Sequence, residues 1–100
     1  MQKMKRTEDY ITLLRKHADE LKTKYGITMM RLFGSVARGE QHEGSDVDLF
    51  VEMPPTLRQV GGAELYLNQL LGCNVDLIRN HKGLTTLFKK QVEKDGINIF

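Results

Sequence analysis

The sequence has little cysteine, little net charge and no long apolar run. Its one cysteine in 100 residues, Cys73, cannot form an internal disulfide, so we expect a reducing, cytoplasmic environment. No stretch approaches the roughly 18 apolar residues of a membrane span, and charged residues throughout the first 25 positions exclude a recognisable signal peptide. The net charge of +2 gives no indication of charge-driven binding to nucleic acid.

The remaining composition is that of a globular protein. With 40% hydrophobic and 28% charged residues, the chain has enough apolar material for one core, and its length predicts a single domain over residues 1–100. Hydrophobic periodicity and turn residues predict an α/β (α+β) fold, a small mixed sheet flanked by helices. The expected helices cover residues 7–25 with Thr7 as the N-cap, a segment with Leu57 in its buried set that ends at Leu71, and a segment beginning near Leu84. The expected strands cover residues 27–33, 46–51 and 74–78, with residues 97–100 as a short strand or an apolar tail.

The turn at Gly34-Ser35 is the first candidate for function. A glycine at the end of a strand lets backbone N–H groups approach an anion, and Ser35 adds a hydroxyl beside the start of a helical turn. Arg38 lies on the same face as Ser35 if the segment is helical, so it can face a phosphate. The alternative interpretation is an ordinary turn followed by a surface arginine.

Asp46 and Asp48 form the sharper signal. Side chains two residues apart on a strand point to the same face, so these carboxylates lie roughly 7 Å apart. Two like charges on one face of an apolar strand repel each other, and a divalent cation between them relieves the repulsion. Oxygen ligands with few dedicated protein groups are the preference of Mg²⁺. The alternative is an exposed edge strand, or Ser45-Asp46 acting as a cap.

Asp76 interrupts a later apolar run, Asn74 to Ile78. A strand, a helix and a strand in this order favour a parallel crossover, which can place Asp76 beside Asp46 and Asp48. His42 lies alone in the polar loop between residues 39 and 44 and is expected at the surface.

Taken together, these motifs resemble the signature of the polymerase-β-type nucleotidyltransferase superfamily. They are Gly34-Ser35-x-x-Arg38-Gly39, a polar loop, Ser45-Asp46-x-Asp48-Leu49 and Val75-Asp76-Leu77. The greatest similarity is to its minimal branch, the MNT domain proteins that act as antitoxins to HEPN-domain toxins, and it covers nearly the whole chain.

The resemblance implies a nucleotidyltransferase fold and a specific set of roles. Gly34 and Ser35, with Arg38 and Ser45, would bind the nucleoside triphosphate, taken to be ATP by analogy. Asp46 and Asp48 would bind two Mg²⁺ ions, and Asp76 would ligate the ion nearer the acceptor and help to activate its hydroxyl.

The resemblance also implies a partner. A chain of 100 residues has no room for the helical domain with which larger transferases hold an acceptor, so acceptor specificity is expected to come from another protein. In MNT–HEPN pairs the small protein transfers AMP to a tyrosine of the toxin, in a hetero-oligomeric complex. Two alternatives stay open: an antitoxin that acts by contact alone, and a transferase that acts on a small molecule or an RNA.

Overall fold

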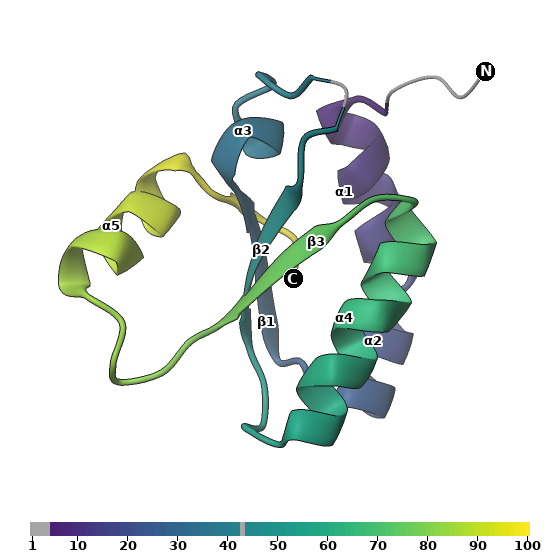
Figure 1. The fold of residues 1–100 in the computed structure, drawn as a ribbon, viewed down its shortest axis with the longest axis vertical. Coiled ribbons are helices and arrows are strands. Elements are labelled where there is room, and N and C mark those ends of the chain that lie inside the picture. The colour runs from purple at the N-terminus through teal and green to yellow at the C-terminus, as the bar shows by residue number, and fades with distance from the viewer. Residues whose placement is uncertain (1–4, 43) are drawn as a thin grey trace.

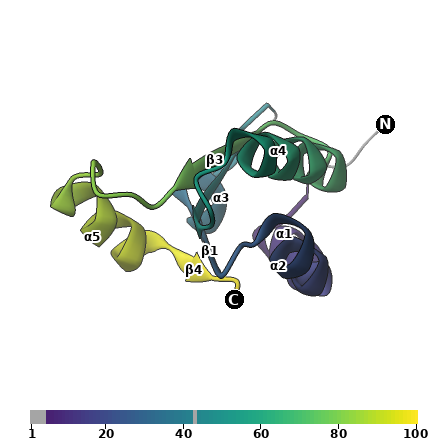
Figure 2. The same ribbon diagram turned by 90° about the horizontal axis from the view of Figure 1, so that it is seen from below.

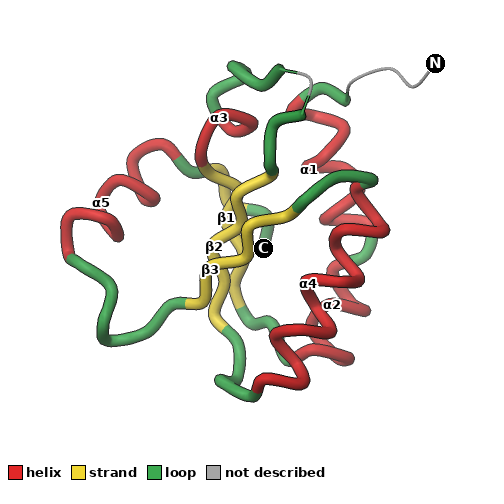
Figure 3. Tube along the Cα trace, viewed as in Figure 1, coloured by secondary structure: helices red, strands yellow, loops and turns green. Residues whose placement is uncertain are grey.

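The fold is a four-stranded mixed sheet with helices on both faces. The computed structural model describes residues 5–42 and 44–100. Two helices, α1 (Thr7–Lys16) and α2 (Ala18–Tyr25), lead into β1 (Met29–Phe33), and the one-turn helix α3 (Gly34–Ala37) follows it directly. The remaining elements are β2 (Val47–Glu52), α4 (Leu57–Leu71), β3 (Val75–Arg79), α5 (Thr86–Asp95) and β4 (Ile97–Asn98). The expected fold class is confirmed (Figure 1; Figure 3).

The sheet has the strand order β3-β2-β1-β4. The β1 strand pairs antiparallel with both β2 and β4, whereas β2 and β3 pair in parallel through the α4 crossover, as expected from the sequence. Figure 2 shows α1, α2 and α4 on one side of the sheet and α5 on the other. The C-terminal residues pack onto the body, because Ile99 is buried and its N–H donates to the carbonyl of Met30.

The alternation of side chains along the strands separates two environments. Val47, Leu49 and Val51 of β2 are fully buried in the main core beneath α1, α2 and α4. Asp48 and Phe50 therefore point to the opposite face, the one that α5 covers in part. One face of β2 thus packs into the main core, whereas the other carries the Asp48 carboxylate beside the buried ring of Phe50.

The expected single helix over residues 7–25 is wrong, because the chain forms two helices that meet at His17. This residue has φ −103° and ψ 15°, outside the helical range. The apolar spacing continues through the break, since Leu14 and Leu21 are both fully buried, so periodicity could not show it. Thr7 is not the N-cap either. Its hydroxyl donates to the carbonyl of Val36 at 2.6 Å and ties α1 to α3.

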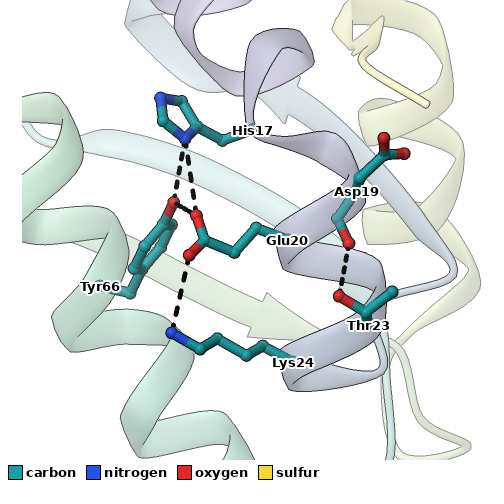
Figure 4. Close-up of polar contacts among 6 residues, drawn as sticks. All are labelled: His17, Asp19, Glu20, Thr23, Lys24 and Tyr66. Carbon is teal, nitrogen blue, oxygen red and sulfur yellow. Dashed lines mark hydrogen bonds and ion pairs between the residues drawn. The ribbon is translucent and has the colours of Figure 1, made fainter.

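Polar contacts join α2 to α4 (Figure 4). The hydroxyl of Tyr66 on α4 donates to the carboxylate of Glu20 and lies 3.1 Å from Nδ1 of His17. Lys24 completes the cluster with its Nζ 3.6 Å from Glu20 Oε1. Burial and the hydrogen bond to Glu20 raise the pKa of Tyr66 to about 12. The cluster fixes the two helices against each other on the face of the sheet away from Asp48.

The expectation that Leu57 is buried is wrong. Leu57, at the first position of α4, is 91% exposed, and Leu87 on α5 is 77% exposed. The α4 helix begins before Gly61-Gly62, with the buried residues Ala63, Leu67 and Leu71 along one stripe. Its inner face is set by the second half of the helix, and Leu57 lies beyond the edge of the core. No described helix has the length and apolarity needed to cross a membrane.

Candidate functional site

Two of the three predicted acids meet on neighbouring strands. Asp48 and Asp76 are register partners in the parallel β2–β3 pair, so their side chains lie side by side on the face that α5 partly covers. Asp48 is half-buried, whereas Asp76 is exposed. Asp46 lies one residue before β2, which begins at Val47 and not at residue 46 as expected. It is exposed, and its charge still acts on the carboxyl group of Asp48.

The Gly34 turn lies directly against Asp48. Phe33, the last residue of β1, is the register partner of Asp48, and the chain turns at Gly34 with φ +76°. A Cβ atom at Gly34 would lie 2.0 Å from Oδ2 of Asp48, which is far inside van der Waals contact. Only glycine allows the turn and the carboxylate to occupy these positions together.

The electrostatics of the site disfavour a charged Asp48. Burial raises the pKa of its carboxyl group, and the neighbouring charges of Asp76 and Asp46 raise it further, while the guanidinium of Arg38 acts in the opposite direction. The free energy cost of holding negative charges together falls if a cation lies among them. The site therefore has an electrostatic demand for positive charge that the protein itself meets only in part.

Ser35 and Arg38 both belong to the turn that faces Asp48. Ser35 lies within α3, and its carbonyl accepts the N–H of Glu40, which closes the turn behind it. Arg38 is the C-cap of α3 and is exposed, with its Nε 3.2 Å from Glu40 Oε2. Its charge nevertheless lowers the pKa of Asp48, so Arg38 is a surface side chain close enough to act on that acid, and a role in facing a phosphate stays a prediction.

Ser45 is held inside its loop. Its Oγ accepts the backbone N–H of His42 at 2.9 Å, and its own N–H donates to the carbonyl of His42 at 2.9 Å. These bonds form a closed turn just before the first acid. His42 is exposed, as expected. Residue 43 of the predicted 39–44 loop lies outside the described residues.

The donor set suits a hard cation. Within residues 5–42 and 44–100, no three His, Cys, Asp or Glu side chains are grouped so that they could hold a metal ion together. The Asp48–Asp76 pair supplies carboxylate oxygens only, and Mg²⁺ commonly takes one or two carboxylates while keeping several waters. The residues present therefore fit Mg²⁺, which Asp48 and Asp76 could ligate, with Asp46 next to them.

A pocket that sequence reasoning missed adjoins the Gly34 turn. It lies between α3 and α5, has a volume of about 190 Å³, and will be called the α3–α5 pocket. Its lining includes Phe33, Gly34, Arg38, Phe88, Gln91 and Asp95. The α5 residues come from a helix whose apolar spacing indicated only packing, and no motif in the sequence marks them.

The chain matches the nucleotidyltransferase domain family over residues 14–99. A predicted protein adenylyltransferase of Methanocaldococcus jannaschii is 40% identical over 98 residues, which cover 96% of this chain and 100% of that protein. Protein adenylyltransferase MntA of Thermococcus cleftensis is 40% identical over 73 residues, covering 71% of this chain and 74% of that one.

Solved structures agree with the fold. The structure of a predicted minimal nucleotidyltransferase superposes with a TM-score of 0.78 at 34% identity, covering 96% of this chain and 98% of that one. A toxin–antitoxin structure with AMP-PNP matches with a TM-score of 0.68 at 26% identity, over 86% of this chain and 72% of that one. The fold is also found in the complex of a tri-AMPylated Shewanella oneidensis HEPN toxin with an MNT antitoxin, with a TM-score of 0.62 at 21% identity, over 90% of this chain and 71% of that one.

The family match spans most of the chain, and the structure places the register pair Asp48 and Asp76 beside the Gly34 turn. The chain therefore belongs to the nucleotidyltransferase domain family and is a minimal nucleotidyltransferase similar to the MntA protein adenylyltransferases.

Proposed function

We propose that this protein transfers AMP from ATP to a tyrosine hydroxyl of a HEPN-domain partner, in the presence of Mg²⁺, and thereby acts as an antitoxin. The observation that carries the proposal is the contact between the Gly34 turn and Asp48, with Asp76 beside it in register. This arrangement puts anion-binding backbone next to paired carboxylates, which is what a triphosphate with its counter-ions needs. The relatives named as protein adenylyltransferases support AMP as the transferred group.

Each residue has a role in the proposal. Backbone N–H groups of Gly34 and Ser35 hold the phosphates, and Arg38 adds positive charge from the same turn. Asp48 and Asp76, with Asp46 beside them, would hold Mg²⁺, and the bound ion would supply positive charge to the phosphates of the substrate.

The chemical step is a displacement at the α-phosphorus. The acceptor oxygen forms a bond to the α-phosphorus, and the bond between that atom and the oxygen bridging to the β-phosphate breaks, so pyrophosphate leaves. Asp76 is exposed and accepts the proton of the acceptor hydroxyl as the new bond forms. Most of the rate enhancement depends on positioning and charge, so the loss of one carboxylate should reduce the rate of AMP transfer severely.

The identity of the acceptor rests on the toxin–antitoxin structures. A solved complex with this fold contains a HEPN toxin that carries three AMP groups. For this chain we propose a partner of the same class, encoded by the neighbouring gene, with a tyrosine as the modified residue.

The test is transfer of label from α-labelled ATP in the presence of Mg²⁺ and the neighbouring gene product. We expect label on the partner, its loss when the partner's acceptor tyrosine is replaced by phenylalanine, and a decrease of at least about a hundredfold in Asp48→Asn and Asp76→Asn. Asp19→Asn, which changes an exposed acid on α2, is the matched control and should transfer normally.

Protection of cells separates transfer from simple contact. If an Asp46→Asn, Asp48→Asn double variant still protects cells from the toxin, the protein neutralises its partner by binding alone and the proposal is wrong. Label on RNA or on a small molecule, with none on the partner, would likewise contradict it.

A further inference from the structure

The α3–α5 pocket has the chemistry of a site for a flat ring. Phe33 and Phe88 are both half-buried, and their ring centroids lie 5.8 Å apart at 88°. Phe50 meets Phe88 from the sheet with centroids 6.1 Å apart, so Phe88 is held on two sides. The rings are fixed by their neighbours while part of each surface stays accessible at the pocket. Fixed aromatic surfaces of this kind bind nucleobases by stacking.

The size of the pocket suits part of a nucleotide. Its volume of about 190 Å³ is below the roughly 300–1,000 Å³ of sites that enclose a whole drug-sized ligand. A base fits such a space, whereas the ribose and the triphosphate must lie outside it. The pocket shares Gly34 and Arg38 with the turn that faces the acids, so a molecule bound in the pocket can continue into the site without a gap.

The register of the sheet sets the distance between the α3–α5 pocket and the acids. Phe33 is the antiparallel partner of Asp48, so the two side chains leave the same face of the sheet from adjacent strands. Directly paired residues have Cα atoms about 4.5–5.5 Å apart. The aromatic wall of the pocket is therefore the immediate neighbour of the acid proposed to act at the reacting phosphate, a separation that one ribose can bridge.

We infer that the α3–α5 pocket binds the nucleobase of the nucleoside triphosphate, with Phe33 and Phe88 as its aromatic wall and Gln91 and Asp95 as its polar rim. This inference rests on the proposed function, because it takes the triphosphate to lie at Gly34. It assigns α5, which carries none of the sequence motifs, to substrate recognition.

The polar rim favours a base with an amino group. An ionised Asp95 can only accept hydrogen bonds, whereas the Gln91 amide can both donate and accept. A purine with an exocyclic amine and an adjacent ring nitrogen satisfies both side chains. The 6-amino group and N1 of adenine have this pattern, so the pocket supports ATP as the substrate.

Calorimetric titration with two probes tests the inference. In buffer containing Mg²⁺, the wild-type protein should bind ATP at least about tenfold more tightly than inorganic tripolyphosphate, which has no base. Gln91→Trp places an indole in the pocket and should weaken ATP binding at least about tenfold while leaving tripolyphosphate binding unchanged. Gln69→Trp, on the exposed side of α4, is the matched control and should bind both probes normally. Circular dichroism checks that each variant is folded.

The outcomes distinguish the two proposals. If the wild-type protein binds tripolyphosphate and ATP equally, or if Gln91→Trp binds ATP as the wild type does, the base does not enter the pocket and the inference is overturned while the proposed function stands. If neither probe binds, the phosphate site itself is absent, and the proposed function fails together with the inference.

The role of Asp95 has its own test. Purine riboside triphosphate is ATP without the 6-amino group, and the wild-type protein should bind it more weakly than ATP. Asp95→Ala should bind the two nucleotides equally. An unchanged preference for ATP in Asp95→Ala would remove Asp95 from the base site.

Discussion

Replacing Gly34 with alanine tests the geometry on which the site depends. The new Cβ would lie 2.0 Å from Oδ2, 2.9 Å from Cγ and 3.2 Å from Cβ of Asp48, so the whole carboxylate must move. The backbone at φ +76° adds strain of about 1–2 kcal/mol for a residue with a side chain. The expected result is a protein destabilised by at least this strain energy, with Asp48 displaced by an ångström or more. Misplacement on that scale costs about a hundredfold in rate.

Gly39→Ala is the matched control for this prediction. Gly39 follows α3 with φ +70°, and no atom outside its chain neighbours lies within 4 Å of a Cβ built there. It therefore imposes the same backbone strain without the collision. Denaturant unfolding gives the free energy of unfolding of both variants, and labelled transfer to the partner gives their activity.

The comparison isolates the contact with Asp48. Both variants should lose about 1–2 kcal/mol to strain, whereas only Gly34→Ala should lose transfer. Transfer by Gly34→Ala at a rate within a few-fold of Gly39→Ala would refute the reasoning, because it would show that the carboxylate need not occupy the position seen against the turn.

Three further predictions concern stability. Leu67→Ala, in the fully buried stripe of α4, should cost about 2–5 kcal/mol in denaturant unfolding, whereas Leu65→Ala, whose side chain is 61% exposed, should cost little. Tyr66→Phe should cost about 0.5–1.5 kcal/mol at neutral pH, because the hydroxyl loses its bond to Glu20. Folding raises the pKa of Tyr66 from the ordinary value of 10 to about 12. The stability that protonated Tyr66 contributes is therefore fully present below pH 10 and is lost as the pH rises to about 12. The free energy of unfolding should therefore decline less steeply with pH across this range in Tyr66→Phe than in the wild-type protein. Equal slopes would contradict the raised pKa of Tyr66. Asp48→Asn should raise the melting temperature of the metal-free protein at pH 7, because it removes a partly buried charge beside other acids, and a fall would contradict that account.

The strands and the acids could be predicted because their signals are local. A short apolar run bounded by turn residues specifies a strand, and the two-residue period places Asp48 opposite to the core face of β2. The crossover from β2 to β3 follows from the order of elements, and it brings Asp76 into register with Asp48. The acid pair is thus contained in the sequence pattern before any tertiary contact is known.

The features that could not be predicted depend on contacts between distant segments. Thr7 has the residue type and position of a cap, yet its hydroxyl bonds to Val36, 29 residues away. Leu57 follows the helical period of α4 but lies past the edge of the core it would need to reach. The α3–α5 pocket requires the docking of α5 beside the Gly34 turn, and no residue pattern in α5 encodes that position.

The location of the acids at one end of the sheet separates catalysis from the opposite end of the molecule. Asp48 pairs with Phe33 at the end of β1, while Met29, at its beginning, pairs with Glu52. The connection from β2 to α4, residues 53–56, therefore leaves the sheet at the far end from the chemistry (Figure 1). An insertion or a fused reporter in this connection should leave nucleotide transfer intact, so the fold offers an attachment point that is independent of its reactive end.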